Sequence, residues 1–454
     1  MRDLRKKALL ESQKTVSRKA RARPESTRGS ATHSPDGSPG NSRAGSRANS
    51  RPNSRPGSRY ASEDEGASDS EYDVMTMSTN SASGDDALDD DPTNTWAERL
   101  QDRIGELQDR KRNTESREAT LAAYLHLVRH HFAENQIARL SSDIIPALLR
   151  SVREGVGEQE RVLALKALVV TLLTSPSEKS SGALLTTLKS LCQEAEVKVK
   201  VQAIYALMVT ITHGGGGDAA GEELLDFLLE IIESDGESVD ASDSGAVVSA
   251  ALKAWGFVAS FLDDMAERSD NVMDAFIDQL DSTDPEVQSS AGTNIAFLFE
   301  AAREHEEETG ESNKMQHHTY RIMTRMGEIV KDSSKAISKK GRRELRFNFT
   351  SIVTSLERGV GPGYRASGRG DNPHVGGAKL RLQDNFEEFG YKETLRVHNK
   401  VVLIDTWLLH VRVEALKMLL GGGLPTHYLE NPVVQDMLET ADVNYVATGI
   451  DRKR

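Results

Sequence analysis

The side chains best suited to a specific interaction form a basic cluster between residues 335 and 347. Five cations fall within the eight residues from Lys339 to Arg346, in a chain whose formal net charge is −13. Clustered cations beside an aromatic ring, here Phe347, are typical of surfaces that bind polyanions. Three more cations lie in the glycine-rich stretch that follows. The ten predicted contacts are Lys335, Lys339, Lys340, Arg342, Arg343, Arg346, Phe347, Arg365, Arg369 and Lys379.

A helical pattern in the same stretch positions these cations. Apolar residues recur at spacings of three and four, which places them on one face of an α-helix. They are Leu345, Phe349, Ile352, Val353 and Leu356. At about 100° per residue, four of the cations and Phe347 lie beside or behind this stripe; the four cations are Lys339, Lys340, Arg343 and Arg346. The pattern predicts a helix that is anchored by its apolar face and presents cations outward. The alternative is a solvated basic helix end without a partner.

Motifs for catalysis or metal binding are incomplete. His126 and His130 have the spacing of a zinc-protease helix, but Leu127 stands where that motif needs glutamate. The glycine run at 214–217 is followed by Asp218 and not by the Lys-Ser/Thr of a phosphate-binding loop. Cys192 lies on an apolar face, which predicts a core residue. We therefore expect no enzyme, no cofactor or metal, and no small-molecule substrate.

Charge divides the N-terminal region into two blocks. Residues 1–60 carry 15 Lys/Arg and 4 Asp/Glu, whereas residues 61–92 carry 11 Asp/Glu and no Lys/Arg. The single cysteine fits a reducing compartment. Neither a signal peptide nor an apolar run of about 18 residues is present, which predicts a soluble intracellular protein that does not contact membranes.

Residues 1–92 are predicted to be a disordered arm, because they lack the large apolar residues needed to offset chain entropy. Ser-Arg pairs recur every four residues within the arm. Such segments bind RNA loosely and release it when phosphorylated. The candidate phosphorylation sites are Ser42, Ser46, Ser50, Ser54 and Ser58. Alternatives are a passive solubilising tail, or an arm that folds back on the acidic block 61–92.

Residues 93–332 are predicted to form helical repeats. Paired helical patterns recur at about 40 residues, the period of armadillo and HEAT repeats. Asp284-Pro285-Glu286 has the residue types of a helix N-terminus. The expected helices, after a first one that begins near Trp96, are 115–133, 142–154, 158–174, 179–193, 196–213, 219–234, 244–262, 268–281, 285–305 and 314–331. The predicted fold class is an all-α armadillo/HEAT-like solenoid with a small C-terminal α+β cap and a disordered N-terminal arm.

The C-terminal part is predicted to mix strands and helices. Residues 333–430 contain the basic helix, a mobile loop at 359–379, and a helix that carries Trp407. Short strands are expected at 380–383, 393–398 and 400–404, with a hairpin at His398-Asn399. Asp405 is the expected N-cap of the Trp407 helix, and the run at 421–423 its end. Residues 431–454 are expected to hold one helix and a basic tail.

Taken together, residues 95–430 resemble the interferon-related developmental regulator family. The resemblance is carried by SSKAISKKGRRELRFNFTSIVTSLERG, a Gly-rich loop, and then LRVHNKVVLIDTWLLHVRVEALKMLLGGGLPTHYLENPVV. It implies an armadillo-like fold and a cytoplasmic, ribosome-hibernation type of translation regulator, which binds idle ribosomes along the mRNA and tRNA path through rRNA and ribosomal proteins. It also implies an alternative: a nuclear scaffold that recruits a histone deacetylase corepressor complex.

Overall fold

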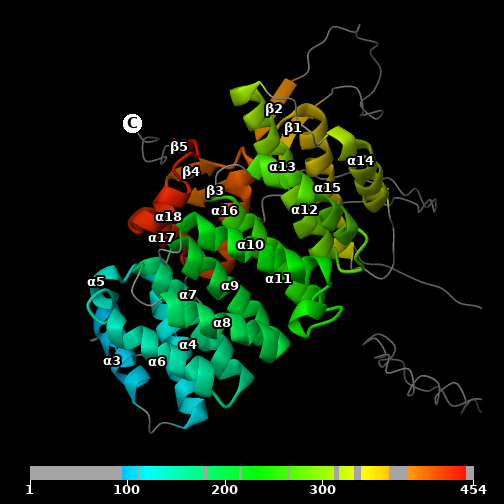
Figure 1. Cartoon of the computed structure of the whole chain (residues 1–454). Coiled ribbons are helices and arrows are strands. Elements are labelled where there is room, and N and C mark those ends of the chain that lie inside the picture. The colour runs from blue at the N-terminus through cyan, green and yellow to red at the C-terminus, as the bar shows by residue number, and fades with distance from the viewer. Residues whose placement is uncertain are drawn as a thin grey trace, which may run out of the picture. The chain divides into compact units, whose positions relative to one another are not determined.

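The structure is a computed structural model, coloured along the chain in Figure 1. It describes residues 95–109, 113–176, 181–213, 217–262, 265–310, 316–331, 339–367, 387–391 and 393–445. These residues all belong to one compact unit, Ser68–Arg454. The predicted arm at 1–92, its five candidate serines and the tail after residue 445 lie outside the described residues. The expected strand at 380–383 does so as well.

Paired antiparallel helices make up most of the described chain. The pairs are α3 (Trp96–Gln108) with α4 (Thr114–His130), α6 (Ser141–Glu154) with α7 (Glu158–Thr174), α8 (Ser181–Glu194) with α9 (Val197–His213), α10 (Gly217–Glu233) with α11 (Gly245–Ala259), α12 (Met265–Gln279) with α13 (Pro285–Thr309), and α14 (Gln316–Lys331) with α15 (Lys339–Arg358). The second helix of each pair packs on the second helix of the next. This arrangement confirms the predicted helical-repeat fold.

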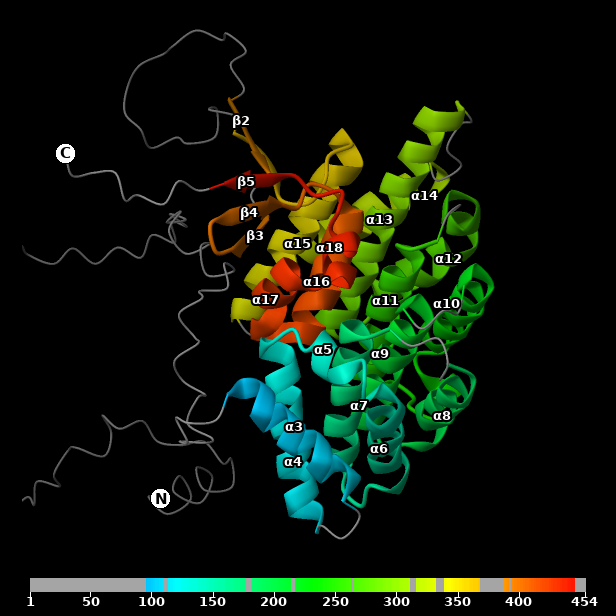
Figure 2. The same ribbon diagram turned by 90° about the vertical axis from the view of Figure 1, so that its left-hand side faces the viewer.

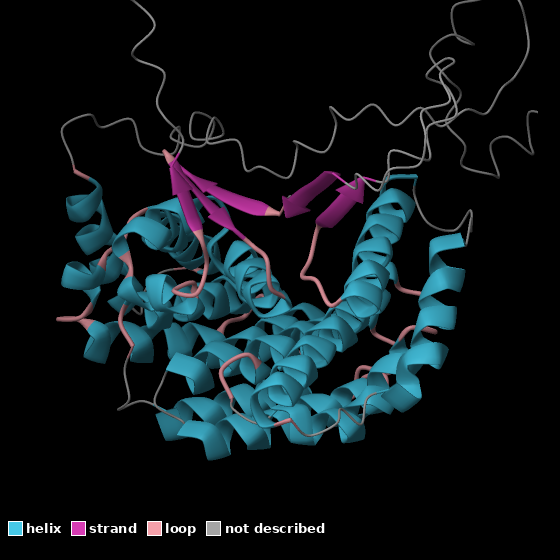
Figure 3. Cartoon of the chain, turned by 90° about the horizontal axis from the view of Figure 1, so that it is seen from above, coloured by secondary structure: helices cyan, strands magenta, loops and turns pink. Residues whose placement is uncertain are grey.

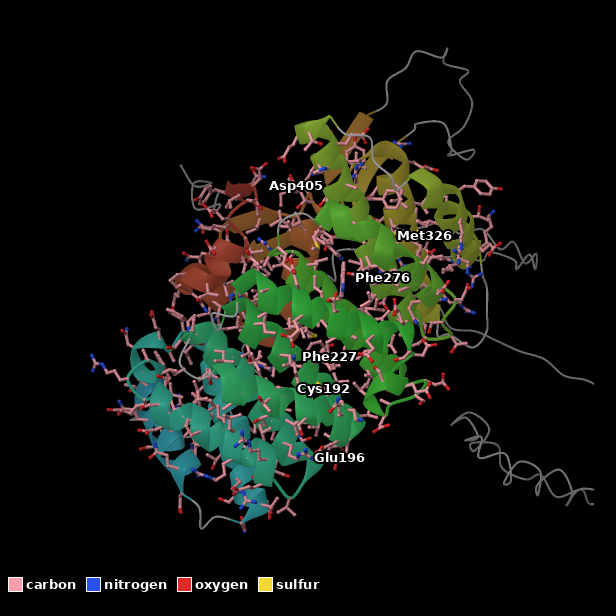
Figure 4. The ribbon with its side chains drawn as sticks, viewed as in Figure 1. Cys192, Glu196, Phe227, Phe276, Met326 and Asp405 are labelled. Atoms are coloured by element: carbon pink, nitrogen blue, oxygen red, sulfur yellow. The ribbon has the colours of Figure 1, made fainter. Side chains whose placement is uncertain are left out.

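Local sequence explains where α13 begins. At α13, the Asp284 carboxylate accepts a hydrogen bond of 2.8 Å from the Glu286 amide, and Pro285 occupies the first turn, as predicted. The predicted helix 115–133 is too long, because α4 ends at His130 and the chain turns extended at His131. A separate short helix, α5 (Glu134–Ile137), follows. Cys192 is a core residue of α8, as predicted (Figure 4).

The second helices form a layer that is buried on both sides. In α11, every residue from Val247 to Ala259 except Lys253 is buried. A helix that is apolar almost all round needs neighbours on both faces. The first helices cover one side of this layer, and the C-terminal helices of the chain cover part of the other. Figure 2 shows α16, α17 and α18 alongside the second helices.

Those C-terminal helices are α16 (Trp407–Leu420), α17 (Leu424–Glu430) and α18 (Pro432–Met437). The prediction that Asp405 is the N-cap of α16 was wrong, because Thr406 occupies that position and its side chain accepts the Leu409 amide at 3.2 Å. The run Gly421–Gly423 does end α16, but it continues as a 3-10 turn, η6, directly into α17. Helix α17 was not predicted. It precedes α18, which is the single helix expected within residues 431–454.

The strands form two small antiparallel sheets on one side of the helices (Figure 3). As predicted, β3 (Thr394–Val397) and β4 (Lys400–Leu403) make a hairpin, which turns at His398 with a positive φ of 52°. The third strand of that sheet, β5 (Val443–Tyr445), was not predicted. The antiparallel pair of β1 (Tyr364–Ser367) and β2 (Glu387–Tyr391) was not predicted either. Strand β1 lies within the segment 359–379, which was expected to be a mobile loop.

No helix in the described part of the chain is both long and apolar enough to cross a membrane.

Candidate nucleic-acid interface

Helix α15 is held in place by the apolar stripe that the sequence predicted. Leu345, Phe349 and Ile352 are buried, and Val353 and Leu356 pack against the same core. The helix lies between α13 and α14, which places it at the end of the series of pairs. These contacts fix the direction in which the opposite side of α15 faces.

Close packing of α15 on α13 depends on a glycine. A Cβ atom built at Gly292 of α13 would lie 2.9 Å from Cε1 of Phe349 and 3.0 Å from Cδ1 of Ile352. Atoms of that kind do not approach so closely, so a side chain at this position would force the Phe349 ring or the Ile352 side chain to shift. The lack of a side chain at Gly292 therefore permits the observed packing.

The opposite side of α15 carries Arg343 and Phe347 of the predicted cluster. Arg343 and Phe347 are exposed, Phe347 to 38 %, whereas Arg342 and Arg346 are half-buried. The Nε atom of Arg346 is itself buried and has no hydrogen-bond partner. Lys339 and Lys340 form the first turn of the helix, but their side chains lie outside what the structure describes. Arg343 and Phe347 therefore lie away from the apolar stripe and Arg346 lies beside it, whereas Arg342, three residues before Leu345, continues the line of the stripe.

The remaining predicted contacts are only partly placed. Arg365 belongs to β1, where its backbone is opposite Gly390 of β2, next to an irregularity in the register. Lys335, Arg369 and Lys379 lie outside the described residues. The structure thus brings together the α15 residues and leaves the contribution of the loop as a prediction.

Polar contacts tie the end of α15 to the segment that leads into β1. The Ser351 hydroxyl accepts the Gly363 amide at 2.9 Å, and the Ser355 hydroxyl donates to the Gly361 carbonyl at 3.2 Å. A Cβ at Gly361 would lie 1.7 Å from the Asp405 carbonyl oxygen, so glycine is required there. These contacts fasten α15 to the chain that precedes α16.

Arg412 of α16 is a connection that the sequence did not reveal. Its Nε donates to the Ser260 hydroxyl and its Nη1 to the Met437 carbonyl, both at 3.1 Å, while Nη2 donates to the Ser260 carbonyl. The guanidinium also lies 4.3 Å from the ring centroid of Phe261. One side chain thus joins α16 to α18 and to the end of α11.

A second unpredicted connection joins α17 to the first repeats. The His427 Nε2–H donates to the Val128 carbonyl at 3.1 Å, which leaves Nδ1 to accept from the Asn431 amide at 3.2 Å. Asn431 also donates to the Leu173 carbonyl at 3.0 Å. Burial lowers the pKa of His427, so this arrangement favours the neutral ring.

An ion pair fixes the hairpin to α16. His410 Nδ1 lies 2.8 Å from the Glu393 carboxylate, just before β3. Burial disfavours the charged form of both groups, but their mutual attraction outweighs it. The pKa of His410 is therefore raised and that of Glu393 lowered.

Glu300 of α13 meets the N-terminus of α16. Its carboxylate accepts the Leu408 amide at 3.1 Å. Burial raises its pKa to about 7, although the hydrogen bonds from the amides of Trp407 and Leu408 act in the opposite direction. The Leu408 amide lies in the first turn of α16 and has no acceptor within that helix, so the Glu300 side chain anchors α16 by accepting its hydrogen bond.

Glu300 makes the stability of the chain depend on pH. Its folded pKa of about 7 exceeds the ordinary 4.5, so its stabilising contribution is complete below about pH 4.5 and is lost as pH rises through 7. We expect Glu300→Gln to raise the free energy of unfolding at pH 8, by up to about 3 kcal/mol, and to change it little at pH 4.5. Urea unfolding at four pH values measures this.

The control for that series is Glu307→Gln, which alters an exposed carboxylate of the same helix. A Glu300→Gln variant that follows the wild-type pH profile from pH 4.5 to 8 would contradict the assigned role.

Paired helices stacked in series, with a basic final helix, define a helical-repeat scaffold. Proteins of this class expose long surfaces on which macromolecules bind. The profile of the family described as "Interferon-related developmental regulator" matches residues 70–357, which include nearly all of α15. The chain belongs to the interferon-related developmental regulator family.

A relative in Schizosaccharomyces pombe is 23% identical over 366 residues, which is 76% of this chain and 74% of that protein. It is described as an uncharacterized protein, so the similarity adds no function.

Proposed function

We propose that this chain is a non-enzymatic factor that binds translationally inactive ribosomes and occupies the path of mRNA and tRNA. The observation that carries the proposal is the geometry of α15. Its buried stripe fixes the helix to α13, while Arg343 and Phe347 are exposed on the other side. Cations attract phosphates, and an exposed ring offers a base a stacking surface. Membership of the family agrees with this role, because ribosome binding is a function that the family resemblance implies.

The acidic surface of the repeats gives the bound chain an orientation. Along α10, the outward positions are exposed carboxylates and no cation occurs in the helix. They are Asp218, Glu222, Glu223, Asp226, Glu230 and Glu233. Such a surface repels rRNA and attracts the basic ribosomal proteins. The proposed complex therefore has α15 against rRNA and the acidic side towards protein.

Catalysis plays no part in the proposed role. The Cys192 thiol is unsuited to nucleophilic chemistry because burial raises its pKa to about 12. The His126 and His130 rings contact each other within α4 at a tilt of 37°, and His130 Nδ1 lies 2.9 Å from the His126 carbonyl oxygen. Within the described ranges, no group of three or more His, Cys, Asp or Glu side chains is arranged to hold a metal ion. We accordingly propose neither a cofactor nor a small-molecule substrate.

Sedimentation tests the proposal directly. When lysate is separated on a sucrose gradient at physiological salt, we expect the protein to migrate with idle ribosomes and to be depleted from polysomes. Brief treatment with a translation initiation inhibitor should increase the ribosome-bound fraction, because it creates idle ribosomes.

Two results would contradict the proposed ribosome-binding function. One is a protein that stays at the top of the gradient under both conditions. The other is a tagged copy that resides mainly in the nucleus and recovers deacetylase complexes in place of ribosomal proteins, since we propose a cytoplasmic location.

A further inference from the structure

One buried imidazole joins α17 to the end of α4. The His427 side chain is inaccessible to solvent and lies nearly perpendicular to the Phe132 ring, with centroids 6.0 Å apart. Its Nε2 atom lies 3.1 Å from the Val128 carbonyl oxygen, and its Nδ1 atom lies 3.2 Å from the Asn431 side-chain amide nitrogen. Both ring nitrogens therefore have partners, and those partners determine where the ring carries its protons.

Asn431 permits only the neutral ring. Its Oδ1 accepts the Val433 amide at 3.0 Å at the N-terminus of α18, so its Nδ2 is the atom that faces His427. The same Nδ2 donates to the Leu173 carbonyl at 3.0 Å. An amide N–H donates and cannot accept, so Nδ1 of His427 is the acceptor and the proton lies on Nε2, which donates to Val128. A second proton on Nδ1 would set two donors against each other in a buried site.

The surroundings of His427, as far as the structure describes them, offer no negative charge for a protonated ring. Burial lowers the pKa of His427 and the charge of His130 on α4 lowers it further, although the backbone carbonyls of Val128 and Arg129 act in the opposite direction. The other charged or titratable side chains on the elements around α17 have other partners or are exposed. They are His131 stacked on Trp96, Lys417 paired with Glu414 on α16, Lys400 over the Tyr428 ring, and the exposed Arg396, Glu430 and Asp436.

The attachment of α16 responds to acid in the opposite way. Glu300, which anchors the start of α16, contributes more stability as pH falls through 7. The His410–Glu393 pair stays charged in mild acid, because the pKa of His410 is raised and that of Glu393 is lowered. The glycine turn 421–423 separates α16 from α17, and its first residue has a positive φ of 53°. The two helices are therefore able to respond to pH separately.

We propose that His427 is an acid-sensitive link, and that protonation of its ring detaches α17 from the ends of α4 and α7 while α16 stays attached to α11 and α13. The pKa of His427 in the folded chain is below the ordinary 6.5. The stabilising contribution of the neutral ring is therefore complete above about pH 6.5 and is lost as pH falls below that value. This inference does not depend on the proposed role of α15.

Hydrogen exchange of the full-length chain, followed by mass spectrometry at pH 7.5 and 5.5, tests the proposal. After correction for intrinsic exchange rates, we expect the protection of amides in α17 to fall about three- to tenfold at the lower pH. Tenfold is about the limit for one proton taken up by an open form one pH unit below its pKa of 6.5. The amides of α16 should keep their protection and serve as the internal reference.

Three variants isolate the ring. His427→Gln has no titrating group at this position, so α17 should show equal protection at the two pH values, whatever its level. Asn431→Asp supplies a carboxylate that accepts from a protonated Nδ1, so the sign should reverse and α17 should be better protected at pH 5.5. His130→Gln, the same change at the exposed neighbouring histidine, should leave the wild-type pH dependence in place.

Four results would overturn the proposal. The first is wild-type protection of α17 that is the same at both pH values. The second is a loss of protection in acid that persists in His427→Gln, and the third is a loss of the wild-type sign and size in Asn431→Asp. The fourth is an equal loss of protection in α16 and α17, which would mean that acid unfolds the C-terminal helices together and not at this link.

Discussion

Replacing the five clustered cations in the first eight residues of α15 by glutamine is expected to release the chain from ribosomes at physiological salt while the fold remains intact. Each phosphate contact contributes about 0.7–0.9 to the slope of log affinity against log salt, so losing several contacts lowers affinity steeply and flattens that slope. Glutamine retains much of the apolar stem, so packing beside the stripe changes little. The five changed positions are Lys339, Lys340, Arg342, Arg343 and Arg346. Cosedimentation at several salt concentrations measures both effects.

A control variant separates a specific contact from overall charge. Five cations at other positions are replaced, so that the net charge is equal in the two variants. They are Arg103, Arg139, Arg150, Arg153 and Lys189. We expect this control to bind more tightly than the α15 variant at every salt concentration. If both bind alike, or if the α15 variant cosediments as the wild type does, α15 is not the ribosome contact.

Phe349→Ala is expected to lower the free energy of unfolding by about 3–5 kcal/mol, the range for fully buried phenylalanines. The Phe349 side chain is inaccessible to solvent and would be in contact with any side chain placed at Gly292. Its removal leaves a cavity between α13 and α15 that the close helix packing cannot readily fill. Urea denaturation measures this loss, and an unchanged m-value shows that the substitution altered stability and not the compactness of either state.

Phe347→Ala is the matched control, since the same chemical change is made two residues away on the exposed side of the helix. A change of no more than about 0.5 kcal/mol in stability is expected there. RNA affinity should fall by about 1–3 kcal/mol if a base stacks on the ring. Equal destabilisation by the two substitutions would show that the orientation of α15 is wrong.

The cover formed by α16 to α18 also restricts where partners bind. Arg412 and Asn431 fasten these helices to the repeats through backbone carbonyls of Ser260 and Leu173. A partner that used the covered side of the second helices would have to displace these bonds. The proposed rRNA and protein contacts use α15 and the first helices, which leave the cover in place.

Local features of this protein were predictable from its sequence because they depend on neighbouring residues. The stripe from Leu345 to Leu356 follows from helical periodicity, and the start of α13 from the side chain of Asp284. The hairpin at His398 follows from two apolar runs separated by a short polar turn. In each case the partners lie within a few residues, so their types and spacing determine the structure.

Long-range pairings were decided only by the tertiary structure. Arg412 meets Ser260 across 152 residues, and His427 meets Val128 across 299. Glu300 becomes an anchor for α16 only because packing brings α13 to its N-terminus. Polar side chains of these types are usually solvated, and nothing nearby in the sequence marks them as buried. Their roles arise when the chain closes on itself, because burial then makes each unsatisfied amide or charge costly and a distant partner necessary.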